Sequence, residues 1–217
     1  MVRKAKRLSL EELSPYLFED APRADPLAAL PVIDFSQLFD NDNPVELEVG
    51  CGKGLFLLNT ALASPSTNFL GIEIVRKYQL FTATRIALRK IPNVLVACGD
   101  GKAFLRDRVP ARSLQTIHVY YPDPWWKTRH HKRRLFTAEF VELCVRSLQP
   151  GGGLSLATDV PEYFAVMLLL CRAHPRLSEA APPETLEATH DLDYLTNFER
   201  KARKQGKPVF RALFTSR

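Results

Sequence analysis

The sequence predicts an α/β protein: a mostly parallel sheet of seven strands, with helices on both faces and an antiparallel hairpin at its C-terminal end. Short apolar runs alternate with helical stretches five times between Pro44 and Pro161. This alternation is typical of parallel strands joined by crossover helices. Two more strand-like runs follow without a clear helix between them. A length of 217 residues and a hydrophobic fraction of 46% allow one domain with a sizeable core.

In the first half, three short runs rich in Val, Leu and Ile predict buried strands. Glycine-containing turns follow the first and third runs, and an amphipathic stretch with Leu80, Ala83 and Ala87 on one face follows the second. The expected strands are residues 45–49, 69–74 and 94–98, and the expected helices are residues 55–63, 77–90 and a short one that ends near residue 106.

The second half repeats this order of strand and helix. Thr137 has a side chain suited to a helix N-cap, and Pro150 with the three glycines after it ends that helix. Pro161 fits the first turn of the next helix, because that position needs no N–H donor. The expected strands are residues 116–121, 154–158, 176–180 and 209–214.

Residues 1–40 differ from the rest of the chain in composition. Four of the first seven residues are basic, and the stretch then becomes acidic and contains prolines. We therefore expect an N-terminal basic arm with short helices near residues 8–17 and 33–39. The main domain is expected over residues 41–217.

Charge and cysteine usage limit the classes of partner. A net charge of +6 and a pI near 9.2 favour a polyanion such as nucleic acid. The four cysteines lie far apart, which is typical of a reducing compartment and gives no metal-ligand spacing. The adjacent His130 and His131 cannot share one helix face as a metal pair would. No apolar run suits a signal peptide or a membrane span, so we expect a cytoplasmic protein with no metal and no membrane contact.

Acidic residues lie at the ends of the first three expected strands. Glu48 precedes a glycine-rich turn, Glu73 ends the second strand, and Asp100 follows the third. Carboxyl ends of parallel strands share one sheet edge, where proteins of this architecture bind their ligands. Gly50 and Gly52 let a ligand approach the backbone closely. Glu73 is placed to bind both hydroxyls of a ribose, and Asp100 to reach an adenine edge.

Two cofactors are alternative explanations of this pattern of acidic residues and glycines. A nicotinamide dinucleotide needs the third glycine of G-x-G-x-x-G, but Leu55 or Leu57 occupies that position, depending on the starting glycine. Glu48 would also repel a pyrophosphate, whereas it suits the ammonium and sulfonium charges of S-adenosylmethionine. We therefore expect S-adenosylmethionine. Taken singly, Glu48 also fits a buried carboxylate paired with a lysine, and Glu73 also fits a helix-capping contact.

An aromatic, proline-framed turn directly precedes a run of basic residues. The stretch from Tyr121 to Arg134 reads YPDPWWKTRHHKRR, with Asp123 between two prolines. Such a combination suits a site that holds a flat base beside a phosphate backbone.

These residues resemble the bacterial tRNA (guanine-N7)-methyltransferase family, whose members are Rossmann-like class I methyltransferases. The resemblance runs from about residue 44 to the C-terminal end. The glycine motif at residues 48–54 is shared by many methyltransferases, whereas the PDPW turn with its basic tail and the late TNFE motif are more specific. One departure is Trp126, where the family usually has proline. The other matching pieces are Gly71-Ile72-Glu73, Gly99-Asp100, Lys127, Arg129 to Arg134 and Ala157-Thr158-Asp159.

The resemblance implies methyl transfer from S-adenosylmethionine to N7 of a guanine in the tRNA variable loop, conventional position 46, forming 7-methylguanosine. It implies that Asp123 is the catalytic residue and also adjoins the cofactor. We interpret Asp123 as orienting the guanine, because N7 has a free lone pair and no proton must leave the nucleophile. The implied cofactor-binding residues are Glu48, Gly50, Gly52, Glu73, Asp100 and Asp123, and the implied substrate-binding residues are Lys127, Asp159, Thr196, Asn197, Phe198 and Glu199.

The resemblance also implies that tRNA is the partner and that the enzyme is a monomer or a homodimer. Trp125 and Trp126 are candidates for stacking on an unpaired base, although packing suits Trp126 equally well. The expected RNA contacts are Arg129, His130, His131, Lys132, Arg133 and Arg134.

Simpler interpretations exist for three of these residues. Asp123 would also fit a plain turn before proline. Asp159 would fit an N-cap of the helix that begins near Pro161. Glu199 would fit an ion pair with Arg200 or Lys201 on a solvated face.

Two other functions remain open at this point. A non-catalytic RNA-binding module would keep the basic loop but would not need Glu48, Glu73 and Asp100. A methyltransferase acting on a protein or a small molecule would leave the clustered Arg and Lys residues unexplained.

Overall fold

The computed structural model describes residues 8–19, 31–125, 129, 134–182, 190 and 193–217. The strands are β1 (Leu17–Phe18), β2 (Val45–Val49), β3 (Asn68–Glu73), β4 (Val94–Cys98), β5 (Leu114–Tyr120), β6 (Leu148–Thr158), β7 (Leu177–Ala180) and β8 (Phe210–Ser216). The helices are α1 (Leu10–Leu13), the 3-10 helix η1 (Ser14–Tyr16), α2 (Phe35–Phe39), α3 (Leu55–Ala63), α4 (Arg76–Ala87), α5 (Gly101–Asp107), α6 (Ala138–Ser147), α7 (Pro161–Arg172) and α8 (Asn197–Lys204).

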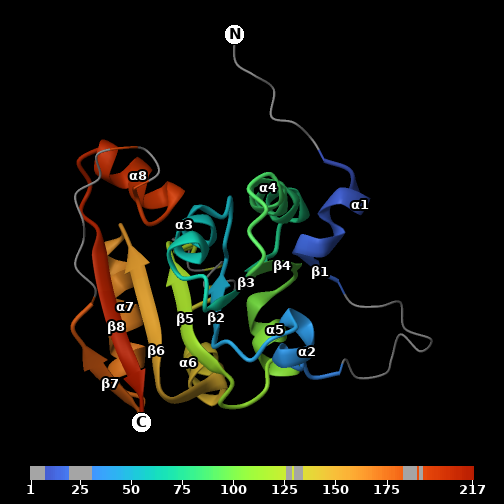
Figure 1. Cartoon of the computed structure of the whole chain (residues 1–217). Helices are drawn as coiled ribbons and strands as arrows, with labels where there is room; N and C mark the ends of the chain where they lie inside the picture. Colours follow the sequence, from blue (N-terminus) through green and yellow to red (C-terminus); the bar gives the residue numbers. More distant parts are fainter. Residues whose placement is uncertain (1–7, 20–30, 126–128, 130–133, 183–189, 191–192) are drawn as a thin grey trace.

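The strands form one sheet in the order β1-β4-β3-β2-β5-β6-β8-β7 (Figure 1). Every neighbouring pair from β1 to β6 is parallel, whereas β8 is antiparallel to both β6 and β7. The predicted fold class, a mostly parallel sheet with a closing antiparallel hairpin, is confirmed. The register places Val49 beside Ile72 on one side and Val119 on the other, so β2, β3 and β5 end at the same edge of the sheet.

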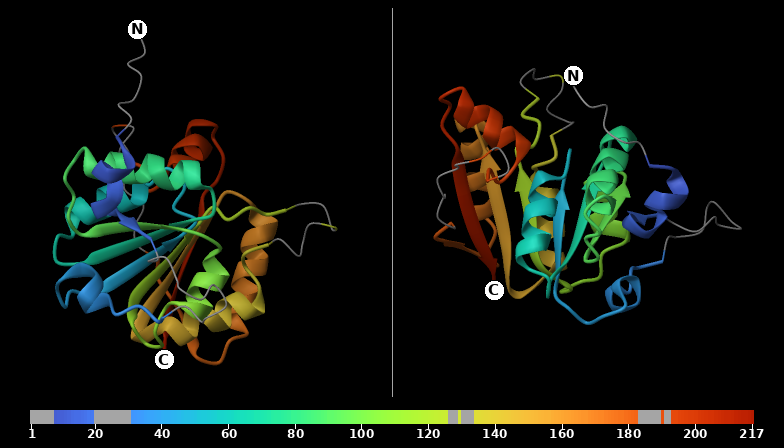
Figure 2. Two further views of the ribbon diagram at one scale, coloured as in Figure 1. Left: turned by 90° about the vertical axis from the view of Figure 1, so that its right-hand side faces the viewer. Right: turned by 45° about the horizontal axis from the view of Figure 1, so that its top comes forward.

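Helices cover both faces of the sheet (Figure 2). On one face, α5, α6 and α7 bury Phe104, Phe140 and Met167 in the larger hydrophobic cluster. On the other face, α3 and α4 bury Phe56 and Ile86 in the second cluster. Burial of apolar surface on both faces explains why β3 and β4 read as nearly continuous apolar runs rather than as alternating ones.

Three elements differ from the sequence prediction. The structure adds β1, because a strand of two residues is too short to leave a pattern. It adds α8, whose mostly polar sequence NFERKARK has few apolar residues to mark a buried face. It also begins β6 at Leu148 instead of residue 154. A Cβ at Gly152 would lie 2.9 Å from the carbonyl oxygens of Gln115 and Gln149, so the chain passes this point only because glycine has no side chain.

Residues before position 41 contribute to the same sheet. β1 pairs with β4, and Ser9 and Glu12 form a capping box at the start of α1. The family resemblance begins later, so the division into an arm of residues 1–40 and a domain of residues 41–217 stays a prediction. In the part of the chain that the structure describes, no helix has both the length and the apolar character that crossing a membrane requires.

Candidate active site

The candidate site lies at the carboxyl edge of the sheet, where the loops after β2, β3, β4 and β5 meet. These four strands are neighbours in the sheet and run in the same direction. Helix α8 lies beyond the ends of β5 and β6 at this edge (Figure 1). A cavity of about 530 Å³ lined by Ile33, Asp42, Val45 and Ser113 contains none of the expected site residues, and the start of β2 lies in its wall.

The glycine-rich loop after β2 is held in a tight, left-handed conformation. Gly50, Gly52 and Gly54 have φ values of 82°, 54° and 66°, a region that non-glycine residues rarely adopt. A Cβ on Gly54 would overlap the side chain of Thr82 from α4. The Thr82 hydroxyl donates a hydrogen bond of 2.9 Å to the carbonyl of Gly52. The loop is therefore packed directly against α4.

Glu73 connects the end of β3 to this loop. One carboxylate oxygen accepts from the Gly52 N–H at 2.9 Å, and the other accepts from the Val75 N–H at 2.9 Å. Val75 is the N-cap of α4, so this second bond is a contact at the start of that helix, as the capping alternative expects. Capping alone does not account for Glu73, because its other oxygen holds the glycine loop. Each carboxylate oxygen keeps a further lone pair for a ligand.

Glu48 is a buried carboxylate with no counter-charge in the part of the chain that the structure describes. It is 3% exposed, and its Oε2 atom has no hydrogen-bond partner among the described residues. The alternative of a lysine partner finds no support in that part of the chain. Burial, and secondly the nearby Glu73, raise the pKa of Glu48 from its ordinary value of 4.5 to about 8. A cationic ligand would relieve both effects, so this position is suited to a positive charge.

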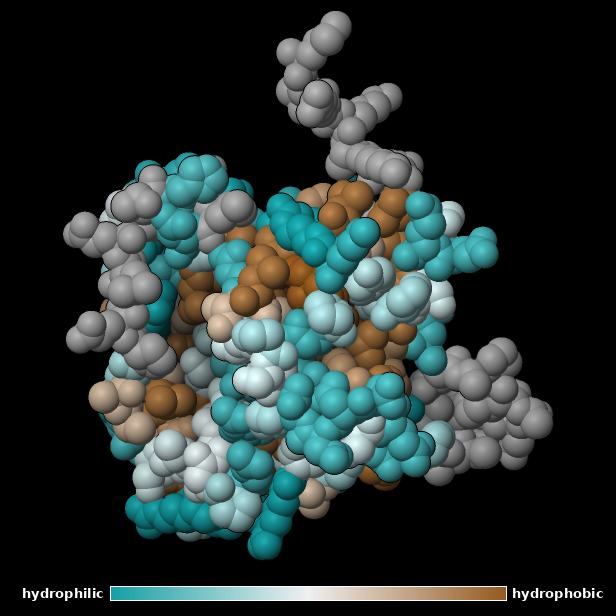
Figure 3. All heavy atoms as spheres, in the orientation of Figure 1, coloured by the Kyte–Doolittle hydropathy of each residue, from teal (hydrophilic) through white to brown (hydrophobic). Residues whose placement is uncertain are grey.

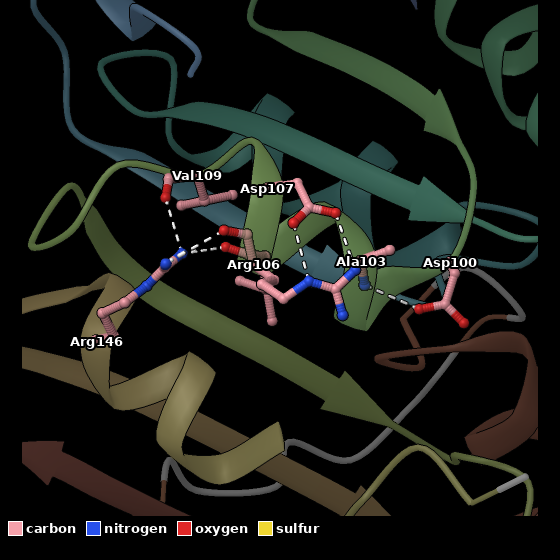
Figure 4. Close-up of polar contacts among 7 residues, drawn as sticks. Asp100, Ala103, Arg106, Asp107, Val109 and Arg146 are labelled. Carbon is pink, nitrogen blue, oxygen red and sulfur yellow. Dashed lines mark hydrogen bonds and ion pairs between the residues drawn. The ribbon is translucent and has the colours of Figure 1, made fainter. Parts of the chain in front are cut away.

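Asp100 lies at the start of α5 after β4. Its Oδ1 atom accepts a hydrogen bond of 3.0 Å from the Ala103 N–H, so it caps the helix with one oxygen (Figure 4). The other end of α5 is fixed by Arg146 of α6, which donates to the carbonyls of Leu105 and Val109. Asp100 is exposed and therefore accessible to a ligand.

The turn after β5 is strained and braced. Tyr121 and Trp125 have positive φ values of 53° and 43°, each at a cost of about 1–3 kcal/mol. Asp123 between them is exposed. Arg134 holds the turn, because its Nε atom donates to the Pro124 carbonyl at 2.8 Å. Strained turns of this kind cluster at functional sites, which does not favour a plain turn role for Asp123.

Helix α8 places Phe198 against the aromatic turn and close to the glycine loop. The rings of Phe198 and Tyr121 are stacked with centroids 5.9 Å apart. A Cβ on Gly52 would lie 3.9 Å from the same phenylalanine ring. Asn197 is the first residue of α8, and Thr196 is its N-cap, accepting from the Glu199 N–H at 3.0 Å. The TNFE motif therefore lies beside the glycine loop after β2.

Glu199 is buried, contrary to the alternative of an ion pair on a solvated face. It is 1% exposed and accepts from Arg211 of β8 at 2.7 Å and from Arg203 at 3.4 Å. Its other oxygen accepts from the Leu195 N–H at 3.2 Å. Glu199 therefore holds α8, the helix that carries Phe198, against the sheet.

Asp159 does not cap α7. The N-cap of α7 is Val160, without a side-chain hydrogen bond, so this alternative is wrong. Asp159 instead lies 3.8 Å from Lys207, and its side chain is 27% exposed. Pro161 occupies the first turn of α7 as predicted.

Several expected residues lie outside the described part of the chain, namely Trp126, Lys127, His130, His131, Lys132 and Arg133. Arg129 is described and exposed. Two further residues, Tyr121 and Arg211, adjoin the site and were not among the expected ones. The position of Tyr121 at the start of the aromatic turn marks it as a candidate in the sequence. No sequence pattern marks Arg211, because its partner Glu199 belongs to another element. Among the described residues, no group of three or more His, Cys, Asp or Glu side chains is placed to hold a metal ion.

Comparison with known proteins identifies the family. The profile of a family described as "Putative methyltransferase" matches residues 42–212. The tRNA (guanine-N(7)-)-methyltransferase of Rhodopirellula baltica is 39% identical over 217 residues, which cover 97% of this chain and 80% of the relative. The chain belongs to the tRNA (guanine-N(7)-)-methyltransferase family. The relative from Dechloromonas aromatica is 34% identical, over 98% of this chain and 85% of its own length.

The fold of this family member agrees with the comparison. The crystal structure of the 16S rRNA methyltransferase KamB superposes with a TM-score of 0.63 at 19% identity, covering 86% of this chain and 95% of that one. The chain is a methyltransferase of the S-adenosylmethionine-dependent class. The sequence-based identification of the family and of the enzyme class is confirmed.

Proposed function

We propose that this protein transfers a methyl group from S-adenosylmethionine to N7 of a guanine in the variable loop of tRNA, conventional position 46, and so forms 7-methylguanosine. The family membership supports this reaction. The single structural observation that carries it is Glu48 near the end of β2, which is buried and whose Oε2 atom has no hydrogen-bond partner among the described residues. A non-catalytic RNA-binding module has no use for such a group, because a buried carboxylate without a partner destabilises the fold.

The residues at the carboxyl edge fit this cofactor. Glu48 matches its ammonium group, and Glu73 keeps lone pairs for the ribose hydroxyls. Asp100 caps α5 with one oxygen, which leaves the other for the adenine amine. Gly50 and Gly52 have no side chain to block the approach of the ligand. When bound, S-adenosylmethionine supplies an electrophilic methyl group on its sulfonium.

Positioning is the main task of the protein in this reaction. Guanine N7 has an available lone pair, so no side chain needs to remove a proton from it. Well-aligned reactants lower the barrier by about 7–11 kcal/mol. Asp123 orients the base by accepting hydrogen bonds from its N1–H and N2–H₂ edge, and it offsets the positive charge that grows on the purine. Lys127, Asp159, Thr196, Asn197 and Phe198 form the rest of the substrate site, and the expected substrate residue Glu199, which is buried, supports it by holding α8 in place.

The basic residues after the aromatic turn bind the RNA backbone. Arg129, His130, His131, Lys132 and Arg133 contact phosphates, and Arg134 does so in addition to bracing the turn. The enzyme works in the cytoplasm as a monomer or a homodimer, and it needs no metal. These assignments follow from the family resemblance and from the charge of the loop.

One assay tests the proposal. An unmodified tRNA transcript is incubated with the purified protein and methyl-labelled S-adenosylmethionine, and the labelled nucleoside is identified after digestion. We expect 7-methylguanosine, and no label in a transcript with adenine at position 46. Asp123→Ala should lose most methyl transfer while tRNA affinity stays near the wild-type value. Binding of tRNA without any affinity for S-adenosylmethionine would instead support the non-catalytic module.

A further inference from the structure

The segment that carries α3 and α4 contains few acidic residues, although Glu19, from outside this segment, pairs with Arg76. Between positions 49 and 99 the sequence contains one acidic residue, the buried Glu73. The same stretch contains six basic residues, Lys53, Arg76, Lys77, Arg85, Arg89 and Lys90. In the view of Figure 3, hydrophobic and strongly hydrophilic residues lie side by side on the surface over α3 and α4.

One side of α4 combines aromatic and basic side chains. Tyr78, Phe81 and Arg85 are separated by three and four residues, a spacing that places them on one helix face, and Arg89 follows in the turn directly after the helix. Tyr78 is 39% exposed and Phe81 is 41% exposed. Arginines interleaved with exposed aromatic rings are a common feature of surfaces that bind nucleic acid.

This side of α4 is connected to the glycine loop. Arg85 donates a hydrogen bond of 2.6 Å to the carbonyl of Lys53, and the Lys53 ammonium lies 5.9 Å from the centre of the Tyr78 ring. Arg89 donates to the Arg85 carbonyl at 3.3 Å. Neither Arg85 nor Arg89 forms an ion pair with a carboxylate among the described residues, whereas the exposed Arg172 pairs with Glu179.

Helix α8 adds the positive charge of Arg200 to those of Arg85 and Arg89. Burial, then Arg89, then Arg200 of α8 lower the pKa of Arg85 below its ordinary value. Arg85 therefore lies close enough to Arg89 and to Arg200 for their positive charges to oppose its own. α8 and α4 lie at the same end of the molecule, on either side of α3 (Figures 1 and 2). A cluster of like charges is stabilised by a bound polyanion.

We propose that Lys53, Arg85, Arg89 and Arg200, together with the rings of Tyr78 and Phe81, form a second tRNA-binding surface, the α4–α8 surface. It is distinct from the basic loop after β5, and it contacts the phosphodiester backbone away from the target guanine. The inference rests on the proposed function and adds to it. Because Lys53 belongs to the glycine loop, RNA bound here is fixed relative to the cofactor and to Phe198. Such contacts fix the register of the RNA and read no sequence.

The test compares two double variants with the same change in net charge. Arg85→Gln with Arg89→Gln removes two charges from the α4–α8 surface. The control, Arg106→Gln with Arg172→Gln, removes two arginines that form exposed ion pairs on α5 and α7, on the other face of the sheet. The affinity of each variant for an unmodified tRNA transcript is measured at several salt concentrations, and S-adenosylmethionine affinity is measured by calorimetry.

We expect the α4 variant to bind tRNA at least tenfold more weakly at low salt. The slope of log affinity against log salt should fall by about 1.4–1.8, because each phosphate contact contributes about 0.7–0.9. The control should keep the wild-type slope, and cofactor affinity should stay within about threefold in both variants. Arg200→Gln, which leaves the Arg85 to Lys53 hydrogen bond in place, should lower the slope by about half as much.

Three results would overturn the inference. An unchanged slope in the α4 variant excludes phosphate contacts by Arg85 and Arg89. An equal loss of slope in the control shows a general effect of net charge. A loss of cofactor affinity as large as the loss of tRNA affinity shows that Arg85 only holds the glycine loop. Failure of the proposed function is distinguishable, because the wild-type protein would then form no 7-methylguanosine at all.

Discussion

The ring of Phe198 stacks on the ring of Tyr121, with centroids 5.9 Å apart and an angle of 18° between the planes. Phe198 belongs to α8, and Tyr121 begins the turn that carries Asp123. The same Phe198 ring lies close to Gly52 of the glycine loop. One side chain therefore stacks on the element proposed to bind the guanine and lies close to the element proposed to bind the methyl donor.

Replacing Phe198 with alanine should reduce activity more than stability. The side chain is 57% exposed, so its removal exposes little new apolar surface, and the free energy of unfolding should change by less than about 1 kcal/mol. We expect kcat/KM for tRNA methylation to fall at least tenfold, because the two loops lose their common contact. Leu169→Ala is the matched control, since Leu169 is 69% exposed on α7. Equal activity of the two variants would contradict the proposed role of Phe198.

The pKa of Glu48 predicts a pH dependence of stability in the cofactor-free protein. Its folded-state value of about 8 lies above its ordinary value of 4.5, so the native state binds the extra proton between these values. Stability therefore falls as pH rises from 4.5 to 8. Between pH 6 and pH 8 this loss is on the order of 2 kcal/mol. Urea denaturation at both values, in the wild type and in Glu48→Gln, measures it.

The Glu48→Gln variant should lack this pH-dependent loss, because its amide does not titrate. It should also be more stable than the wild type at pH 8, with a Tm higher by about 2–4 °C for each kcal/mol recovered. Its affinity for S-adenosylmethionine should fall at least tenfold, since the carboxylate that meets the cation is gone. A variant with wild-type affinity, or with the same slope of stability against pH, would refute this assignment.

The strands and the glycine loop of the site are predictable from local sequence. The short run of residues 45–49 predicts a strand, and the glycine-rich turn after Glu48 marks where that strand ends. Neighbouring parallel strands end at the same edge of the sheet, so the run also predicts the edge at which a ligand binds. Glu73 and Asp100 follow from the same argument. The PDPW turn is specific enough to identify the family, although its strained conformation at Tyr121 leaves no local signal.

Contacts between distant elements could not be predicted in the same way. α8 has few apolar residues, so its sequence pattern does not show which face is buried and does not predict the helix. Its position depends on Glu199 meeting Arg211, a pairing set by how β8 joins the sheet. The cluster of Arg85 and Arg200 has the same origin. In these cases the sequence supplies the charges, and the tertiary fold decides which of them meet.

Gly54→Ala should damage the glycine loop more than an equivalent change elsewhere. Gly151→Ala is the control, because Gly151 also has a positive φ, 78°, but a Cβ there would meet no atom within 4 Å. The control should cost about 1–2 kcal/mol of stability. Gly54→Ala should cost about 1–3 kcal/mol more, because its Cβ overlaps Thr82, and it should weaken cofactor binding.

The overlap with Thr82 has its own test in a double variant. Gly54→Ala with Thr82→Ser removes the methyl group that the new Cβ meets and keeps the hydroxyl that donates to Gly52. It should recover part of the lost stability, which is the non-additivity expected of residues in contact. Strictly additive effects of the two changes would show that the overlap is not the cause.

Arg134 should influence both catalysis and RNA binding. Its Nε atom donates to the Pro124 carbonyl, and its guanidinium lies 5.3 Å from the centre of the Tyr163 ring. Arg134→Gln should lower kcat about tenfold, since Asp123 precedes Pro124 in the same turn. The salt slope of tRNA affinity should fall by about 0.7–0.9 if one phosphate contact is lost. A change in the salt slope without a change in kcat would show that the hydrogen bond from Arg134 to Pro124 does not determine the position of Asp123.

The ion pair between Glu199 and Arg211 should be worth much more to stability than an exposed pair. Glu199 is 1% exposed, so replacing it with alanine leaves Arg211 partly buried without its counter-charge, at a cost of about 3–5 kcal/mol. Glu179→Ala, which removes the exposed partner of Arg172, should have little effect. Urea denaturation compares the two variants. Because Glu199 also anchors α8, which carries Phe198, Glu199→Ala should in addition lose activity at temperatures where it remains folded. Full activity there would show that the position of α8 does not matter for catalysis.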